Sequence, residues 1–289
     1  MDNGANRDRT YSVSGIISGE TSDGLLPQDL AEVEFTAHNI RLDNGEFTKP
    51  DIGYAINDHP WFVSAKRVLD VIFPHNRENV RLADLGCLEG GYAVEFARLG
   101  FQVVGIDVRE SNIAACNYVK KNTNLPNLMF IKDDVNNIYR YGDFDIVFCC
   151  GLLYHLDRPS DFLKIASKHT KKLLILQTHF SLESESNPKY AFSNSLSALT
   201  ENEGLSGRWY AEFENDAAFN NREALRWSSW ENRQSFWPRR EYLIQAIYEA
   251  GFDLVMEQYD SLAPNIAEEM LHGYYCVNSR GTFVGVKTK

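Results

Sequence analysis

One segment, residues 80–91, constrains the fold more than any other part of the chain. Its sequence is Val-Arg-Leu-Ala-Asp-Leu-Gly-Cys-Leu-Glu-Gly-Gly, an apolar run that breaks at Gly86 and leads into a helical pattern at residues 92–98. The pattern predicts a buried strand, a tight glycine turn and a helix. Glycines let the backbone approach a ligand closely at the amide-rich start of a helix, so we expect a nucleotide-like cofactor here.

The spacing of the glycines separates two classes of cofactor. A dinucleotide-binding turn requires glycine at three positions that are occupied here by Gly86, Leu88 and Gly91. The middle glycine, which lets the backbone contact a pyrophosphate, is absent. Instead Asp84 precedes Gly86 by two residues, and Gly90 and Gly91 follow. This arrangement resembles motif I of the class I S-adenosylmethionine-dependent methyltransferases, acid-x-Gly-x-Gly-x-Gly, and departs from it at Leu88. A strand-to-helix turn without a ligand is the alternative.

Length, composition and charge exclude several classes of protein. With 289 residues and 44% hydrophobic content, the chain fits one α/β domain with additions. A net charge of −11 and a pI near 5.1 disfavour sequence-independent binding to nucleic acid. We expect a cytoplasmic protein, because no apolar run is long enough to span a bilayer and residues 1–9 lack a secretion signal. Five cysteines without Cys-x-x-Cys spacing indicate reduced thiols and no zinc framework.

The order of strand and helix patterns predicts the domain organisation. Residues 1–24 are expected to form a flexible tail, residues 25–77 a helical and hairpin extension, and residues 78–289 the cofactor-binding domain. In the extension, a turn at Asn44-Gly45 lies between two strand-like pieces, and the following helix can cover the cofactor side of the sheet. Residues 180–237 are too long for a simple connection and are predicted to be a lid and acceptor-binding insertion.

Regular alternation of strand and helix predicts a seven-stranded, Rossmann-like, doubly wound sheet. We expect its final two strands to pair antiparallel at an edge. The predicted strands are 80–85, 101–107, 128–131, 144–149, 172–178, 252–259 and 282–287. The predicted helices are 27–38, 61–72, 92–98, 111–121, 161–169 and 239–250.

Strand endings are site candidates, because ligands of open α/β sheets bind beyond the carboxyl ends of the strands where strand order reverses. Asp107 ends the second strand and is predicted to accept hydrogen bonds from both ribose hydroxyls of an adenosine; capping the next helix is its alternative role. Asp134 follows the third strand and is predicted to accept from the adenine amino group, beside the Val135 amide. A solvated turn aspartate is the alternative for Asp134.

The fourth strand and the residues after it carry a second resemblance. Residues 144–159 have the sequence Phe-Asp-Ile-Val-Phe-Cys-Cys-Gly-Leu-Leu-Tyr-His-Leu-Asp-Arg-Pro. This is similar to the pattern after the fourth strand of many bacterial methyltransferases, including relatives of the enzymes that alkylate wobble uridine in tRNA. The resemblance covers residues 78–180 and implies S-adenosylmethionine as the cofactor. It also implies these cofactor-binding residues: Asp84, Gly86, Cys87, Leu88, Gly90, Asp107, Val108, Asp134, Val135, Cys150 and Gly151.

Methyl transfer to a hydroxyl requires a base, and the candidates are His155 and His179, which follow neighbouring predicted strands. A structural role is the alternative for each. No metal site is expected, although Glu183 and Glu185 lie near in sequence. Residues 180–237 are rich in aromatic side chains, which also suit a hydrophobic layer or a dimer contact. The predicted acceptor-binding residues are Tyr154, His155, His179, Arg208, Trp209, Tyr210, Trp230 and Trp237. Guanidinium groups that could clamp an acceptor carboxylate or phosphate, or simply carry surface charge, are Arg208, Arg222, Arg226, Arg233, Arg239 and Arg240.

Three functions remain open from the sequence. The first is O- or N-methylation of a small acceptor, with anionic and sugar-like molecules as the options. The second is a tRNA-modifying methyl or carboxymethyl transferase, which predicts a basic path leading to the insertion. The third is a non-catalytic module that binds S-adenosylmethionine. A small-molecule partner is expected and a homodimer is an option; nucleic acid and membrane partners are not expected.

Overall fold

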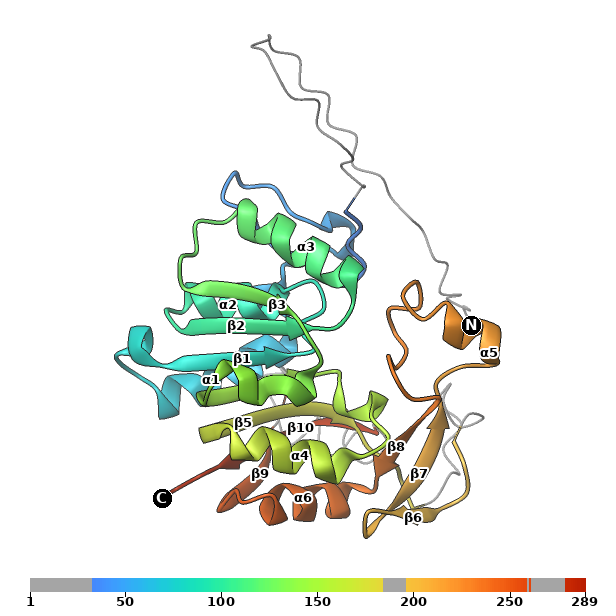
Figure 1. Ribbon diagram of the computed structural model, residues 1–289. Helices are drawn as coiled ribbons and strands as arrows, with labels where there is room; N and C mark the ends of the chain where they lie inside the picture. The colour runs from blue at the N-terminus through green and yellow to red at the C-terminus, as the bar shows by residue number, and fades with distance from the viewer. Residues whose placement is uncertain (1–32, 184–195, 259, 261–278) are drawn as a thin grey trace, which may run out of the picture.

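The computed structural model describes residues 33–183, 196–258, 260 and 279–289 (Figure 1). The predicted tail, residues 1–24, lies outside the described residues, as does the first half of the predicted helix 27–38. The described end of that helix, Val33–His38, is not helical, so the helix prediction is wrong there. The backbone amides of residues 36–38 instead donate to the carboxylate of Glu89. A long-range contact thus replaces the local hydrogen bonds that a helix would form.

The predicted seven-stranded sheet is confirmed, with strand order β3-β2-β1-β4-β5-β10-β9. The first five strands are parallel, and β10 is antiparallel to both β5 and β9, as expected for the final pair. Strand order reverses between β1 and β4, which places the ligand-binding edge at their carboxyl ends. The strands are β1 (Arg81–Leu85), β2 (Gln102–Asp107), β3 (Leu128–Lys132), β4 (Phe144–Cys150), β5 (Thr170–His179), β9 (Leu254–Gln258) and β10 (Arg280–Val286).

Helices cover both faces of this sheet (Figure 1). Side chains of β4 alternate: Ile146 and Phe148 pack with the helices of one face, and Val147 and Cys149 with those of the other. The first face carries α1 (Pro60–Ile72), α2 (Gly91–Arg98) and α3 (Glu110–Lys121). The second carries η4 (Val135–Tyr141), α4 (Pro159–Lys168) and α6 (Arg240–Glu249). No helix in the described ranges is long and apolar enough to cross a membrane.

The N-terminal extension forms a compact element beside α2. The predicted turn is present: Gly45 has φ 87°, and Arg41 and Phe47 form a single antiparallel bridge rather than paired strands. Helix α1 begins at Pro60, after His59, whose ring accepts a hydrogen bond from the Trp61 amide at 3.2 Å. In the described residues, three short 3₁₀ helices precede β1, and one follows β4. They are η1 (Pro50–Ile52), η2 (Ile56–Asp58), η3 (Arg77–Asn79) and η5 (Leu153–His155).

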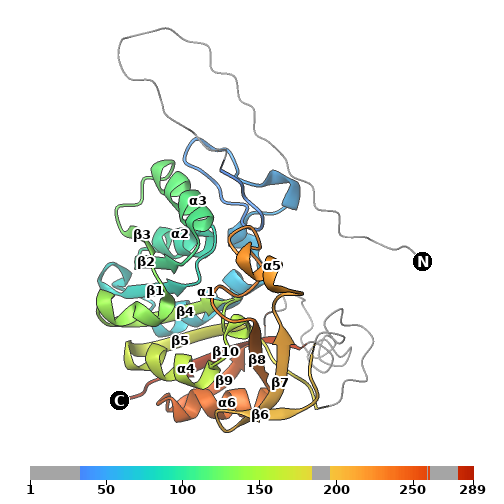
Figure 2. The same ribbon diagram turned by 45° about the vertical axis from the view of Figure 1, so that its right-hand side comes forward.

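The insertion after β5 contains structure that the sequence did not predict. Its described residues form a second antiparallel sheet of β6 (Thr200–Asn202), β7 (Leu205–Ala211) and β8 (Gln234–Pro238), and the short helix α5 (Asp216–Asn220). Aromatic residues of β7 and β8 pack against the hydrophobic core over α4 and α6. The segment between β7 and β8 lies beside the N-terminal extension (Figure 2), where Arg226 donates to the Glu34 carbonyl at 3.0 Å.

Candidate functional site

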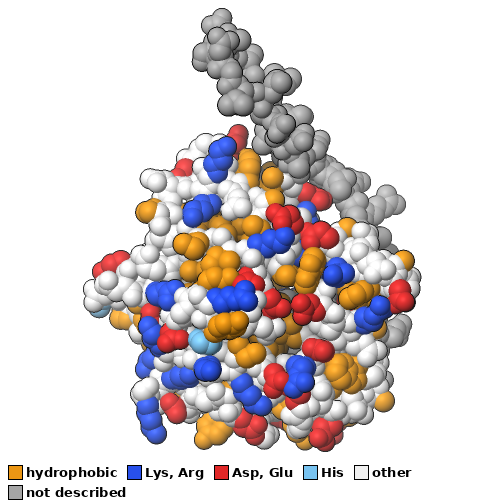
Figure 3. Space-filling view, viewed as in Figure 1, with side chains coloured by type: hydrophobic (Ala, Val, Ile, Leu, Met, Phe, Trp, Pro, Cys, Tyr) orange, Lys and Arg blue, Asp and Glu red, His pale blue; other side chains and the backbone are white. Residues whose placement is uncertain are grey.

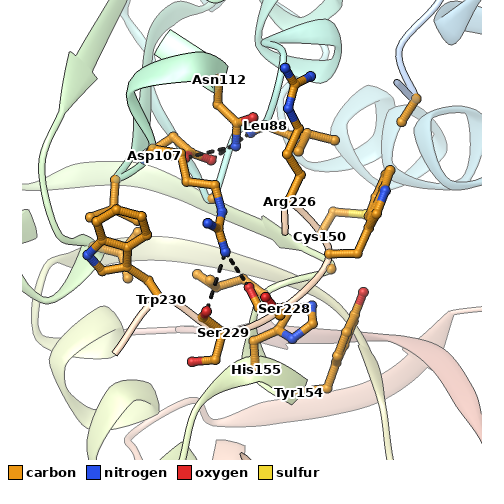
Figure 4. A pocket seen from close by; sticks show the side chains of 18 of the residues that line it. Leu88, Asp107, Asn112, Cys150, Tyr154, His155, Arg226, Ser228, Ser229 and Trp230 are labelled. Atoms are coloured by element: carbon orange, nitrogen blue, oxygen red, sulfur yellow. Dashed lines mark hydrogen bonds between the residues drawn. The ribbon is translucent and has the colours of Figure 1, made fainter. Parts of the chain in front are cut away.

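A cavity of about 690 Å³ lies at the carboxyl ends of the central strands. Its floor comes from the turns after β1, β2, β3 and β4. Its walls come from the N-terminal extension, the start of α1 and residues 226–232 of the insertion. Asp107 and Trp230 lie on one side of this cavity, and Tyr154 and His155 on the other (Figure 4). One space therefore joins the predicted cofactor side with the predicted acceptor side.

The turn after β1 explains the departure from motif I. Leu88 has φ 52°, a left-handed conformation that glycine adopts freely and leucine does not. Two hydrogen bonds hold it there: its amide donates to Asp107 Oδ2 at 3.0 Å, and Cys116 Sγ donates to its carbonyl at 3.2 Å. The backbone at Leu88 thus keeps the shape expected of glycine, while its side chain lines the cavity.

Asp107 lies at the end of β2, lines the cavity and is only 7% exposed. Its Oδ1 accepts from the Arg109 amide and from Asn112 Nδ2, both at 3.0 Å, and its Oδ2 accepts from Leu88. Burial raises its pKa, and these hydrogen bonds oppose the rise. The carboxylate is held in a fixed orientation, and Oδ2, which accepts only one of these hydrogen bonds, retains a lone pair for a ligand hydroxyl.

The other predicted cofactor residues divide into two groups. Those that line the cavity are Gly86, Leu88, Asp107, Val108, Asp134, Val135, Cys150 and Gly151. Asp134 also caps η4, because its Oδ1 accepts from the Asn136 amide at 2.7 Å. Three predicted residues lie outside the lining. The Cys87 and Cys116 sulfurs are 3.9 Å apart, and a Cβ at Gly90 would clash with Phe130, so packing explains both of these positions.

Asp84 is the third of these residues, and it lies beneath the glycine turn with 1% exposure. Its Oδ2 has no hydrogen-bond partner among the described residues. Burial, followed by the negative charge of Asp107, raises the pKa of Asp84 to about 8, against a hydrogen bond from the Ala93 amide. A positively charged ligand group beside these two acids would be stabilised, so the site fits a cationic adenosine-type cofactor.

The acceptor side of the cavity contains a histidine–glutamate pair. His155 Nδ1 lies 3.0 Å from both carboxylate oxygens of Glu212, whose side chain is 1% exposed. The Ser229 amide donates to Glu212 Oε2 at 2.9 Å. Because Nδ1 donates to the carboxylate, Nε2 is left as the proton acceptor of the ring. Glu212 was not predicted from the sequence, because it is 57 residues from His155 in the chain.

The N-terminal extension supplies cavity residues that the sequence analysis did not single out. They are His38, Tyr54, His59 and Trp61, and Tyr92 of α2 lies beside them. Tyr92 Oη lies 3.3 Å from His59 Nδ1. Burial, then the positive charges of His38 and Arg280, lower the pKa of His59 to about 4, so this ring is neutral at pH 7. The position of a helix before the first strand was the available signal in the sequence.

Several predicted acceptor residues lie away from the cavity lining. His179 stacks on Trp237 with ring centroids 4.8 Å apart, and its Nδ1 contacts the Ser279 carbonyl at 3.1 Å. Burial, then Arg280, lower its pKa to about 3. The Trp237 ring also stacks on Tyr210, with ring centroids 5.0 Å apart. Predicted acceptor residues absent from the lining are His179, Arg208, Trp209, Tyr210 and Trp237, whereas Tyr154, His155 and Trp230 do line the cavity.

The segment 226–232, called here the cover segment, is fixed over the cofactor side by Arg109. The Arg109 guanidinium donates to the carbonyls of Ser228 at 2.6 Å and Ser229 at 3.3 Å, and lies 5.2 Å from the Trp230 ring. On the far side, Arg226 lies 3.6 Å from the buried carboxylate of Glu89. The turn after β1, the turn after β2 and the insertion are thereby linked around the cavity.

Comparisons with curated proteins agree with this geometry. Residues 83–173 match a family model described as a methyltransferase domain. A ubiquinone biosynthesis O-methyltransferase of Rickettsia akari is 26% identical over 147 residues, covering 50% of this chain and 55% of that protein. A tRNA U34 carboxymethyltransferase of Helicobacter hepaticus is 33% identical over 122 residues, covering 37% and 38% respectively. The chain therefore spans about half the length of the first relative, and less of the second.

Solved structures share the fold over most of the chain. The N-terminal domain of EvdMO1 with SAH bound aligns with a TM-score of 0.59 and 21% identity, covering 86% of this chain and 90% of that chain. The same domain in the presence of SAH and D-fucose gives a TM-score of 0.57 and 22% identity, with coverage of 80% and 84%. Residues 83–173 thus match a methyltransferase domain, and the fold around the seven-stranded sheet is shared with these SAH-bound structures.

Proposed function

We propose that this chain transfers the methyl group of S-adenosylmethionine to a hydroxyl oxygen of a small acceptor. The observation that carries the proposal is one cavity lined by Asp107 on one side and by His155 on the other, with the His155 ring held from behind by the buried Glu212. The cofactor supplies an activated methyl group. The protein must then hold donor and acceptor in line, exclude water and remove the acceptor proton.

In this proposal, residues of the turns after β1 to β4 hold the cofactor. Asp107 accepts from the ribose hydroxyls, and Asp134 and Val135 face the adenine. Leu88, Cys150 and Gly151 line the space between the two sides. The cover segment acts as a lid, because the Arg109 contacts close it over the cofactor side.

His155 acts as the general base. Its Nε2 accepts the hydroxyl proton as the oxygen becomes methylated, and the buried Glu212 carboxylate stabilises the imidazolium that forms. Glu212 also fixes the orientation of the ring, because both of its oxygens are within hydrogen-bonding distance of Nδ1. An O-methyltransferase among the curated relatives supports oxygen as the acceptor atom.

A tRNA acceptor is less well supported by the arrangement of charges. Arginines of the insertion and of the start of α6 form intramolecular contacts: Arg233 with Asp216, Arg239 with Glu241, and Arg240 with Glu257. Arg208 donates to backbone carbonyls. On the face shown in Figure 3, basic and acidic side chains are interspersed. Phosphate binding draws on available cations, and these arginines are already held by acids or by backbone carbonyls.

The proposal is tested by product analysis. The protein is incubated with S-adenosylmethionine and hydroxylated benzoates or sugar acids, and S-adenosylhomocysteine and methylated product are measured. We expect both products in equal amounts. S-adenosylhomocysteine formed without a methylated acceptor, or methylation of transcribed tRNA in preference to every small molecule, would contradict a small-molecule acceptor. Cofactor binding without turnover on any acceptor would favour the non-catalytic module.

A further inference from the structure

Arg280, the first residue of β10, lines the acceptor side of the cavity. Its Nε and Nη2 donate to Gln177 Oε1 at 3.1 and 2.9 Å. Its guanidinium carbon lies 4.1 Å from the centroid of the Trp61 ring and 5.4 Å from that of Tyr154. An amide and two aromatic rings thus hold this cation in one orientation before any ligand binds.

Arg280 forms no ion pair with a carboxylate among the described residues, and its Nη1 has no hydrogen bond there. This distinguishes it from four other arginines that contact an acid or a backbone carbonyl: Arg208, Arg233, Arg239 and Arg240. Its positive charge contributes to the lowered pKa of His59 and of His179. Arg280 thus places a positive charge on the acceptor side of the cavity, although the whole chain carries a net charge of −11.

A second donor points to the same place. A Cβ built on Gly151 would lie 3.5 Å from Tyr154 Oη and 3.7 Å from Arg280 Nη2, so both groups approach one spot beside the turn after β4. Gly151 has φ 79° and no side chain to occupy that space. Tyr154 Oη has no hydrogen bond to another described residue. A guanidinium and a phenol hydroxyl that converge on one point form a binding site for a carboxylate.

We propose that Arg280 and Tyr154 bind a carboxylate of the methyl acceptor, which is therefore a hydroxy acid. This inference rests on the proposed function and adds the class of substrate. The acceptor hydroxyl faces His155, whose ring centroid is 4.3 Å from that of Tyr154. The carboxylate faces Arg280 on the other side of the same tyrosine. The apolar body of the acceptor then lies among Trp61, Tyr92 and Tyr154.

The experiment measures ligand binding to the complex of the protein with S-adenosylhomocysteine. The probes are benzoate and glucuronate, each with its neutral counterpart, benzyl alcohol and glucose, in titration calorimetry. The variants are Arg280→Met, which removes the charge and keeps much of the side-chain volume, and Arg233→Met as the matched control. Arg233 is exposed, pairs with Asp216 and does not line this cavity.

We expect at least one of the two anions to bind the wild-type complex at least tenfold more tightly than its neutral counterpart. Arg280→Met should abolish this preference and leave S-adenosylhomocysteine affinity unchanged, and Arg233→Met should change neither. Absence of any preference for the anions, or a preference that survives Arg280→Met, would overturn the carboxylate site.

Two further outcomes would overturn it by assigning the cation to the cofactor. One is a tenfold loss of S-adenosylhomocysteine affinity in Arg280→Met, which places the methionine carboxylate on Arg280. The other is an Arg280-dependent, tenfold tighter binding of a donor that carries a carboxymethyl group in place of the methyl. Failure of the wild-type protein to bind S-adenosylhomocysteine at all would instead refute the proposed function, so the two failures are distinguishable.

Discussion

Leu88 shows how one residue can depart from a motif while the backbone keeps the shape the motif requires. Its φ of 52° costs a non-glycine residue roughly 1–3 kcal/mol, and a β-branched residue more. We expect Leu88→Val to lower the free energy of unfolding by about 1–2 kcal/mol relative to wild type. Leu88→Gly should cause no such loss. Urea denaturation of both variants checks this, and a glycine variant less stable than the valine variant would show that the conformation is not strained.

The buried carboxyl group of Asp84 leads to a prediction about how the stability of the folded protein depends on pH. Its pKa of about 8 in the folded protein exceeds the ordinary value of 3.8. Between these two pH values, the folded state therefore keeps a proton that the unfolded state has lost. Its contribution to stability is therefore complete below about pH 4 and is lost as pH rises towards 8. Each pKa unit corresponds to about 1.4 kcal/mol.

Asp84→Asn should remove this dependence. Without cofactor, the variant should gain stability relative to wild type between pH 5 and pH 8, as measured by urea denaturation at both values. Comparing wild type with the variant at the same pH cancels the contribution of all other titrating groups. A difference between wild type and variant that stays constant across this range would mean that Asp84 is already ionised at pH 5.

At the scale of elements, the His155–Glu212 pair is assembled from segments that are distant in the chain. His155 ends η5 and Glu212 follows β7, so their contact depends on the small sheet of the insertion. We expect Glu212→Gln to lower kcat at least tenfold and to leave the affinity for S-adenosylmethionine unchanged, because the amide cannot stabilise an imidazolium as a carboxylate does. His155→Gln should lower kcat at least as much.

The control for this prediction is His169→Gln. That imidazole also contacts an acid, Asp143, at 3.1 Å, but it lies outside the cavity lining. Its variant should retain full turnover. A Glu212→Gln enzyme with wild-type kcat would remove the base role from the pair and leave it a structural contact.

How much could be predicted from the sequence depends on how far apart in the chain the interacting residues are. The sheet, its antiparallel edge and most of the helices were predictable because alternation, glycine turns and capping are local. The helix at 27–38 was wrong in its described part because Glu89, more than fifty residues away, binds the backbone of residues 36–38. Of the six arginines considered for a clamp, Arg226 lines the cavity, whereas Arg233, Arg239 and Arg240 pair with acids whose proximity could not be seen in the sequence.

At the scale of the whole molecule, the site is built from three parts of the chain that meet at one edge of the sheet. The strand tips supply the cofactor side, the N-terminal extension supplies aromatic walls, and the insertion supplies Glu212 and the cover segment. The strand tips were predictable from the order of the strands. The contributions of the other two parts depend on packing between distant segments, and Arg280 enters only because β10 lies beside β5.

The most direct test of the central claim is titration calorimetry of the full chain with S-adenosylmethionine and with NAD, for wild type and for Asp107→Ala. The claim is that an adenosine-bearing sulfonium lies across the tips of β1, β2 and β4. It predicts binding of S-adenosylmethionine to the wild type, affinity at least tenfold weaker in Asp107→Ala, and no heat with NAD. Unchanged affinity in Asp107→Ala, or tighter binding of NAD than of S-adenosylmethionine, would contradict it.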